Sequence, residues 1–215
     1  MIIVGAKGFA KEVLEVLFQL NAFDNVVFFD DINTDAATQL YGHFPVLNNI
    51  EAASAYFKNT DKRFTIGIGN PLLRKMLYDK FTTIGGVFTS TVSPMARIGN
   101  FGNSIADGCN IMTGTVLTSD IVVKKGVLIN LNCTVGHDCT IGEFAELSPG
   151  VNISGNCTIG DYSVFGTNAT LLPKLTIGKN VIVGAGSVVT KDVPDNSLVV
   201  GIPAKIIKEL TPLDF

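Results

Sequence analysis

The sequence predicts an α/β N-terminal domain of Rossmann-like type in residues 1–85, followed by an all-β parallel β-helix with a C-terminal tail in residues 98–215. Two observations support this fold class. A six-residue period of large apolar side chains runs from Ile105 to Val189, and hexapeptide repeats are typical of a parallel β-helix. The first third of the chain instead alternates short apolar runs with helical patterns, which indicates βα units around a parallel sheet.

The repeat predicts which side chains face inward. Every residue in phase with it is large and apolar, namely Ile105, Ile111, Leu117, Val123, Ile129, Val135, Ile141, Leu147, Ile153, Ile159, Phe165, Leu171, Ile177, Val183 and Val189. The residue two places earlier is mostly small or apolar, which predicts a second inward row. The tripeptide Thr-Ile-Gly recurs at residues 140, 158 and 176, so three sixes make one coil of a triangular prism. Successive coils would stack at roughly 4.8 Å.

All four cysteines, Cys109, Cys133, Cys139 and Cys157, fall in the second inward row. A disulfide framework or a metal site is the alternative interpretation. Because their shared phase points into the prism, we interpret them as small buried core residues in a reducing compartment.

Composition excludes several classes of function. The chain has 215 residues, of which 47% are hydrophobic and 16% charged, and its net charge is −3. No run of Lys or Arg stands out, so we expect neither nucleic-acid binding nor a polybasic membrane patch. The start has no basic segment or cleavage site, and no apolar run approaches the length of a membrane span. We therefore expect a cytoplasmic protein without membrane insertion.

The N-terminal third begins with a strand at Ile2 to Val4, a glycine turn and a helix with one apolar face. A second strand ends in the pair Asp30-Asp31, about where a Rossmann unit places its ribose-binding acid. Only Gly5 and Gly8 of the dinucleotide fingerprint are present, so an ordinary tight turn remains an alternative to nucleotide binding.

Three further elements complete this domain. Ile50 to Lys58 predicts a short helix, and a strand starting at Phe64 runs into a second glycine turn. Asn70 is a natural N-cap for a helix that continues through Lys80. In a doubly wound sheet the carboxyl ends of the strands bind ligands. The two glycine turns and the Asp pair all fall there, which predicts a ligand site. Residues 85–97, rich in Gly, Thr and Ser, are the expected domain junction.

His137 occupies the position two after a large apolar residue, which is polar or turn-forming along most of the repeat and should face outward at the corners. An incidental surface histidine is the alternative to a functional one. An exposed imidazole can act as a general base near neutral pH, and Asp138 beside it would favour the cation formed in the reaction. Zinc catalysis of the three-histidine type is not expected, because the chain has 2 histidines.

One predicted corner carries no charge. Pro149, Thr167 and Ala185 stack on it at the eighteen-residue period, whereas the equivalent column contains Glu143, Asp161 and Lys179. An uncharged edge suits a thin acyl-carrier chain, the flank of a neighbouring protomer, or both.

The whole pattern resembles the left-handed β-helix of hexapeptide acyltransferases, and within them the bacterial nucleotide-sugar acetyltransferases of the sialic acid O-acetyltransferase and UDP-4-amino-sugar N-acetyltransferase type. The matching segments are Gly5-Ala6-Lys7-Gly8, Phe29-Asp30-Asp31, Ile68-Gly69-Asn70 with Arg74-Lys75, residues 135–144 and residues 200–205. This resemblance supplies the expected handedness.

The resemblance also implies roles. His137 would be the general base and Asp138 would raise its basicity. Acetyl-CoA, the implied cosubstrate, would lie between subunits of a homotrimer against Glu146, Thr167 and Ala185. The nucleotide-sugar contacts would be Lys7, Gly8, Phe9, Asp30, Asp31 and Gly69. Many relatives have Ser-Gly-His where this chain has Lys7-Gly8-Phe9, which implies a different substrate contact. Asp138 replaces a Glu found in some relatives.

The sequence therefore predicts an acetyl-CoA-dependent N-acetyltransferase acting on a nucleotide-activated amino sugar, without a metal. O-acetylation of a sugar such as sialic acid needs the same base and is one alternative. A non-catalytic β-helix that serves binding or assembly is another, against which His137 and the uncharged corner argue.

Overall fold

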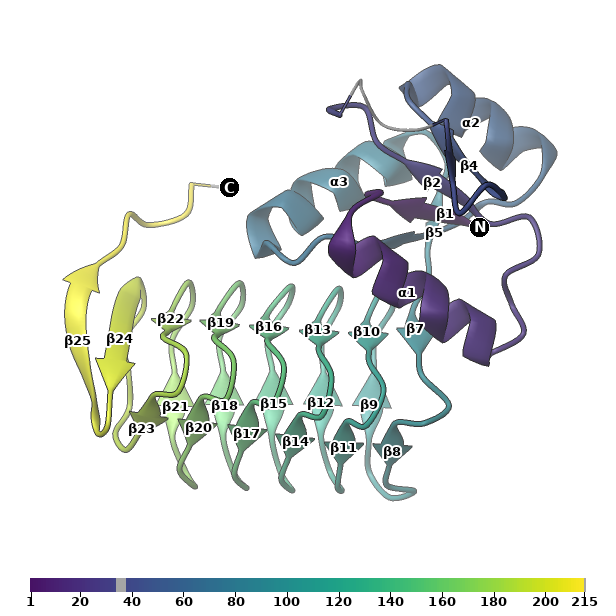
Figure 1. The fold of residues 1–215 in the computed structure, drawn as a ribbon. Coiled ribbons are helices and arrows are strands. Elements are labelled where there is room, and N and C mark those ends of the chain that lie inside the picture. Colours follow the sequence, from purple (N-terminus) through teal and green to yellow (C-terminus); the bar gives the residue numbers. More distant parts are fainter. Residues whose placement is uncertain (34–37, 215) are drawn as a thin grey trace.

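The computed structural model describes residues 1–33 and 38–214 as an α/β domain lying on one end of a parallel β-helix (Figure 1). The N-terminal sheet has the strand order β3-β4-β2-β1-β5-β6. Its strands are β1 (Ile2–Val4), β2 (Val27–Phe29), β3 (Gln39–Leu40), β4 (Phe44–Leu47), β5 (Arg63–Ile66) and β6 (Val87–Phe88), and its helices are α1 (Gly8–Gln19), α2 (Ile50–Asn59) and α3 (Pro71–Thr83). All neighbouring strands pair in parallel except β3 and β4.

The sheet is covered on both faces, because residues of its central strand alternate between two cores. Ile2 and Val4 pack with Phe57 of α2 and Phe81 of α3, whereas Ile3 packs against α1. Gly67 follows β5 where α1 passes so closely that a Cβ would lie 2.6 Å from Ala10. The result is the doubly wound arrangement that the sequence predicts.

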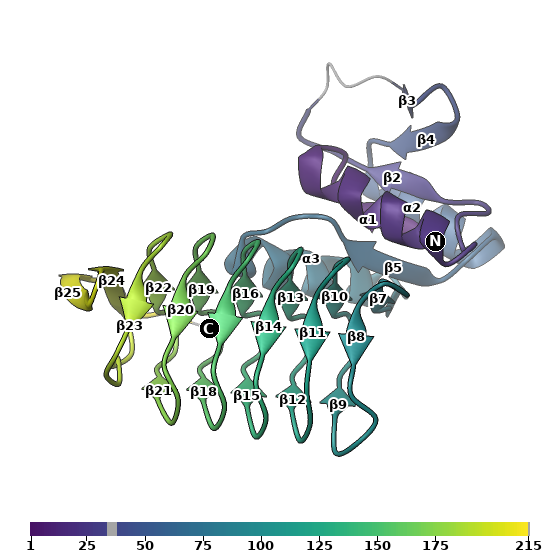
Figure 2. The ribbon, with the colours of Figure 1, turned by 60° about the horizontal axis from the view of Figure 1, so that its bottom comes forward.

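The β-helix is a triangular prism with three sheets, which Figure 2 shows along its length. The first sheet contains β7 (Thr91–Val92), β10 (Asn110–Ile111), β13 (Leu128–Ile129), β16 (Glu146–Leu147), β19 (Val164–Phe165) and β22 (Ile182–Val183). The second contains β8 (Arg97–Ile98), β11 (Val116–Leu117), β14 (Thr134–Val135), β17 (Asn152–Ile153), β20 (Thr170–Leu171) and β23 (Val188–Val189). The third contains β9 (Ser104–Ile105), β12 (Val122–Val123), β15 (Thr140–Ile141), β18 (Thr158–Ile159) and β21 (Thr176–Ile177). The hairpin of β24 (Ser197–Gly201) and β25 (Ala204–Glu209) extends the first sheet.

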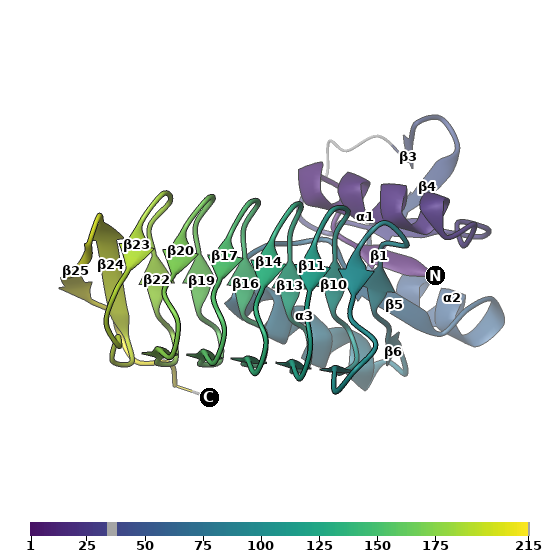
Figure 3. The same ribbon diagram turned by 90° about the horizontal axis from the view of Figure 1, so that it is seen from below.

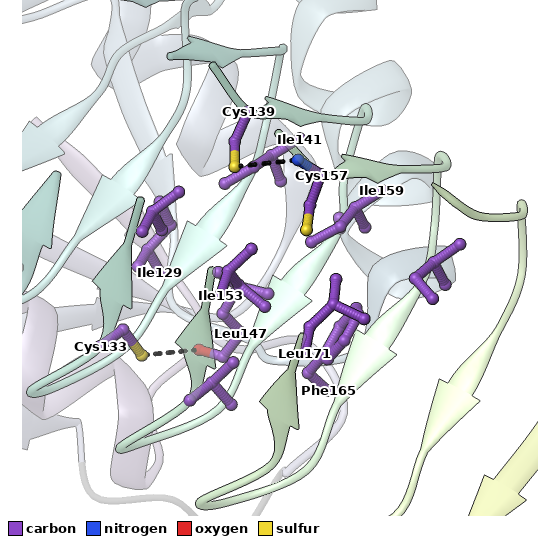
Figure 4. Close-up of a cluster of buried hydrophobic side chains, with 14 of the residues drawn as sticks. Ile129, Cys133, Cys139, Ile141, Leu147, Ile153, Cys157, Ile159, Phe165 and Leu171 are labelled. Carbon is purple, nitrogen blue, oxygen red and sulfur yellow. Dashed lines mark hydrogen bonds between the residues drawn. The ribbon is translucent and has the colours of Figure 1, made fainter. Parts of the chain in front are cut away.

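The interior of the prism follows the sequence repeat. The large apolar residues and the second inward row pack together, with all four cysteines at 1% exposure or less. Figure 4 shows three of them, Cys133, Cys139 and Cys157, among the apolar side chains. Desolvation by burial raises the pKa of Cys109, Cys133 and Cys139 to about 11. These thiols remain protonated at neutral pH and serve as packing groups.

The stacked strands begin at Thr91, where β7 pairs with β10, ahead of the start expected at residue 98. The six-residue period does not reveal β7, because the seven-residue spacing of Ile98 and Ile105 breaks the period before it reaches Val92. The additional residue lies in the loop 99–103, where the Asn103 side chain donates to the carbonyls of Gly99 and Thr118. One extra residue shifts the phase, so the first coil is hidden from a strict count.

The three corners of the prism have distinct surfaces. The first and second sheets meet at the smooth corner (Pro149, Thr167 and Ala185), the second and third at the His137 corner (Ser119, His137, Gly155 and Pro173), and the third and first at the charged corner (Glu143, Asp161 and Lys179). The view from below in Figure 3 shows these turns repeating from coil to coil.

Polar and apolar contacts fix the α/β domain to the first sheet. Val16 of α1 packs on Met112 and Leu128, and the ring of Phe144 stacks on Phe88 at 6.5 Å between centroids.

No helix in residues 1–33 and 38–214 has the length and hydropathy needed to cross a membrane.

Candidate functional site

His137 lies on the turn that follows β14, and 59% of its side chain is exposed. Its Nδ1 is 2.6 Å from Oδ2 of Asp138. Because a carboxylate only accepts hydrogen bonds, this contact assigns the proton to Nδ1 and leaves the Nε2 lone pair directed away from Asp138. The pair therefore has the arrangement of an oriented general base.

Asp138 also suits its backbone. It adopts φ 56, in the left-handed region, as do Asn132 and Asn156 at equivalent turns. Asn and Asp tolerate this region better than longer side chains do. The turn thus favours the shorter acid over the Glu of some relatives, and the carboxylate still reaches the imidazole.

Gly155, one coil further along the His137 corner, was missed by the sequence analysis. A Cβ at this position would lie 2.7 Å from Nε2 and 2.8 Å from Cε1 of His137. Because Gly155 has no side chain, the imidazole of His137 can occupy this space. The eighteen-residue spacing between the two residues is the signal that could have identified it.

The carboxyl ends of β1, β2 and β5 surround a pocket of about 150 Å³. Of the predicted substrate residues, Lys7, Asp30 and Asp31 line it, whereas Gly8, Phe9 and Gly69 are not among its lining residues. Phe9, the second residue of α1, instead packs against the prism, near Leu128. A phenylalanine there contributes to the domain contact.

The acids of this pocket have different partners. Burial acts to raise the pKa of Asp30, but hydrogen bonds from Asn33 and Ile32 together with the charge of Lys7 outweigh it, so this pKa is lowered. Asp31 forms an ion pair with Lys80 of α3 at 2.6 Å. Asp30 thus stays ionised, with both carboxylate oxygens held by Asn33, and Lys7 adds a cation to the same pocket.

A second cluster lies where the α/β domain meets β16. Gly69 is so close to Glu146 that a Cβ on it would lie 3.4 Å from Oε1. Burial raises the pKa of Glu146, partly opposed by the charge of Arg74 and by a hydrogen bond from Ser148. The structure therefore brings together one residue predicted to contact the nucleotide sugar and one predicted to contact the cofactor.

Thr167 and Ala185, the other predicted cofactor residues, are exposed on the smooth corner. The second sheet separates them from His137, because one corner precedes its strands and the other follows them. A single chain therefore does not bring His137 and the smooth corner together.

Among the described residues, 1–33 and 38–214, no group of three or more His, Cys, Asp or Glu could hold a metal ion.

Comparisons with known proteins agree with this architecture. A family model described as the PglD N-terminal domain matches residues 1–81, and the bacterial transferase hexapeptide model matches residues 138–173 and 156–191. WeeI from Acinetobacter baumannii AYE is 34% identical, with a TM-score of 0.86 over 96% of this chain and 100% of that one.

Two other solved structures carry ligands. PerB from Caulobacter crescentus, in complex with CoA and GDP-perosamine, is 30% identical with a TM-score of 0.88 over 96% of each chain. The acetyltransferase domain of PglB from Neisseria gonorrhoeae FA1090, in complex with acetyl coenzyme A, is 30% identical with a TM-score of 0.85 over 96% of this chain and 98% of that one.

The α/β domain and the repeats define a two-domain hexapeptide transferase. The chain belongs to the acetyltransferase family that joins a PglD N-terminal domain to a left-handed hexapeptide β-helix. The resemblance and the fold class predicted from the sequence are both confirmed.

Proposed function

We propose that this protein transfers the acetyl group of acetyl-CoA to the amine of a nucleotide-linked amino sugar. The observation that carries the proposal is the exposed His137 imidazole, hydrogen-bonded through Nδ1 to Asp138, on a chain that matches amino-sugar acetyltransferases from end to end. PerB supports the substrate class, because it is bound to CoA and GDP-perosamine.

In the proposed reaction His137 Nε2 takes a proton from the amine as the amine nitrogen attacks the thioester carbonyl. Asp138 stabilises the imidazolium. When the tetrahedral intermediate collapses, the carbon–sulfur bond breaks, and the proton returns from Nε2 to the CoA sulfur. The products are the amide and free CoA, and the base is regenerated.

The complete site requires a second copy of the chain. His137 and the smooth corner are separated by the second sheet in one protomer, so acetyl-CoA against Thr167 and Ala185 would meet the base of a neighbour. A homotrimer provides three equivalent sites of this kind by rotation. Glu146 would complete the cofactor contacts, and a cytoplasmic location would supply acetyl-CoA.

The pocket at the strand ends is the proposed site for the nucleotide sugar. Asp30 and Asp31 would accept from hydroxyl groups of the ligand, as acids at this position of a Rossmann unit do. Lys7 precedes α1 and has no side-chain hydrogen bond into the helix. The first-turn N–H groups and the lysine together favour an anion such as the diphosphate.

Lys7→Met should raise the KM for the nucleotide sugar by about tenfold, since a charge-assisted contact to phosphate is lost. The KM for acetyl-CoA should not change. Lys11→Met is the matched control, because Lys11 lies further along α1, where its ammonium group is over the ring of Tyr41. Equal KM values for wild type and Lys7→Met would remove Lys7 from the nucleotide site.

Ala185→Arg should weaken both the trimer and acetyl-CoA binding. It places a long cation on an edge that the proposal buries between protomers, and an unpaired buried charge costs several kcal/mol, on the order of 3–5. Lys179→Arg on the charged corner is the control and should be nearly neutral. Light scattering after sizing chromatography, with the KM for acetyl-CoA, gives the result. An unaltered trimer with an unaltered KM would show that the smooth corner faces only solvent.

Incubation with acetyl-CoA and a panel of UDP-, dTDP- and GDP-linked 4-amino sugars tests the proposal against its alternatives. An acetylated product that survives mild base indicates an amide. A product that loses the acetyl group in mild base would indicate O-acetylation, and no product from any sugar would favour a non-catalytic module.

A further inference from the structure

Arg74 is the largest fully buried side chain of the described residues, with 1% exposed, and the proposed reaction does not use it. Its helix, α3, begins at Pro71 and is capped by Asn70, whose side chain accepts from the N–H groups of Leu72 and Leu73. This cap places Arg74 in the first turn. The side chain points from the α/β domain toward the turns of the prism at residues 126 and 144–145.

The guanidinium donates to four backbone carbonyls from three segments. Nη1 donates to Gly69, Nε to Gly126 at 3.3 Å, and Nη2 to both Phe144 and Ala145, the latter at 3.0 Å. Only arginine presents five donors in a fixed fork that can satisfy acceptors in several directions. Desolvation lowers the pKa of Arg74, and the charge of Glu146 opposes this shift.

The bonded segments belong to both proposed substrate sites. Gly69 follows the loop residues Gly67 and Ile68, which line the sugar-nucleotide pocket. Ala145 immediately precedes Glu146, a proposed acetyl-CoA contact. One side chain thus fixes the pocket loop to the strand that carries Glu146.

We propose that Arg74 is a positioning residue that holds the nucleotide-sugar pocket and the acetyl-CoA edge in register. The inference rests on the proposed function, because it assigns the two ends of this connection to the two substrates. Displacement of the Gly69 loop relative to β16 would misalign the amine and the thioester, and small misalignments strongly reduce the rate of a reaction between two bound groups.

A second polar connection between the domains provides a matched control. Asn110 of β10 donates to the carbonyl of Ile66 at 2.8 Å and accepts from Thr65 Oγ1 at 3.0 Å. It is equally buried, at 2% exposed, but has no bond to the Gly69 loop or to β16. Loss of Asn110 should lower stability without changing the register of the two sites.

The test compares wild type, Arg74→Lys and Asn110→Ala in the full chain, at a temperature where all three are folded by circular dichroism. Acetyl-CoA and GDP-perosamine, with the other 4-amino sugars of the panel, are the substrates. Arg74→Lys retains the charge but not the fork, and its kcat/KM for both substrates should fall by about tenfold to a hundredfold. Asn110→Ala should show wild-type kinetics despite a lower melting temperature.

A lower melting temperature with wild-type kinetics for Arg74→Lys would overturn the proposal, since Arg74 would then be only structural. Equal kinetic losses in both variants would also overturn it. If wild type has no turnover with any sugar, the proposed function fails, and hydrogen exchange decides the positioning role separately. Arg74→Lys should then speed exchange at residues 67–70 and 144–147 while Asn110→Ala does not, and unchanged exchange there would contradict it.

Discussion

His137→Ala is expected to reduce turnover by roughly 10²- to 10⁴-fold, the usual contribution of a general base. The protein should remain folded, because the imidazole is 59% exposed and contributes little to packing. Thiol release from acetyl-CoA measures the rate, and circular dichroism melting measures the fold. The KM values should change little, since the base is not proposed to hold either substrate.

Asp138→Asn separates orientation from charge in the same experiment. Asn adopts the left-handed backbone of this turn as readily as Asp, so the loop should be preserved. The amide cannot stabilise the imidazolium as a carboxylate does, and we expect a smaller loss than for His137→Ala. If His137→Ala keeps turnover within about threefold of wild type, the loss is too small for a general base, and His137 is removed from the mechanism.

Gly155→Ala is expected to have the second largest effect, a fall in kcat of about tenfold to a hundredfold. The new Cβ would lie 2.7 Å from Nε2 of His137, so the ring must leave the position in which it receives the proton. The imidazole is exposed and can swing away, which should leave the melting temperature nearly unchanged.

Pro173→Ala is the control for Gly155→Ala, since it alters the next coil of the same corner without adding an atom beside the imidazole. It should retain wild-type kcat. A crystal structure or histidine NMR spectrum of Gly155→Ala should show a displaced ring. Normal kcat together with an undisplaced ring would mean that this glycine is not needed for catalysis.

The prism could be predicted in detail because each coil repeats one simple rule. Its inward positions must be apolar, so the position of Ile141 and Ile159 in the repeat predicts that they are buried. The position of His137 in the repeat predicts that it is exposed. The rule ends where the loop length changes: the additional residue in loop 99–103 hid β7. The hairpin of β3 and β4 was not anticipated, since Pro45 argues against a paired strand, whereas the structure pairs β4 with both β2 and β3.

The candidate site could be predicted only where one residue type carries its own chemistry. His137, Asp138 and the Asp pair follow from residue type and position. The contact of Gly69 with Glu146 and the four carbonyls around Arg74 depend on how the two domains pack, and no local pattern specifies that packing. Phe9 shows the converse, because the family resemblance implies a ligand contact for it, whereas the structure packs it against the prism.

The central claim is most directly tested by following free CoA while the protein is incubated with acetyl-CoA and GDP-perosamine, beside the GDP-sugar that carries a hydroxyl in place of the amine. The panel of other 4-amino sugars is run in parallel. We predict that CoA release requires an amine-bearing sugar, matches the amount of amide formed, and is lost in His137→Ala. CoA release that is independent of the amine, or equal in wild type and His137→Ala, would contradict the assignment.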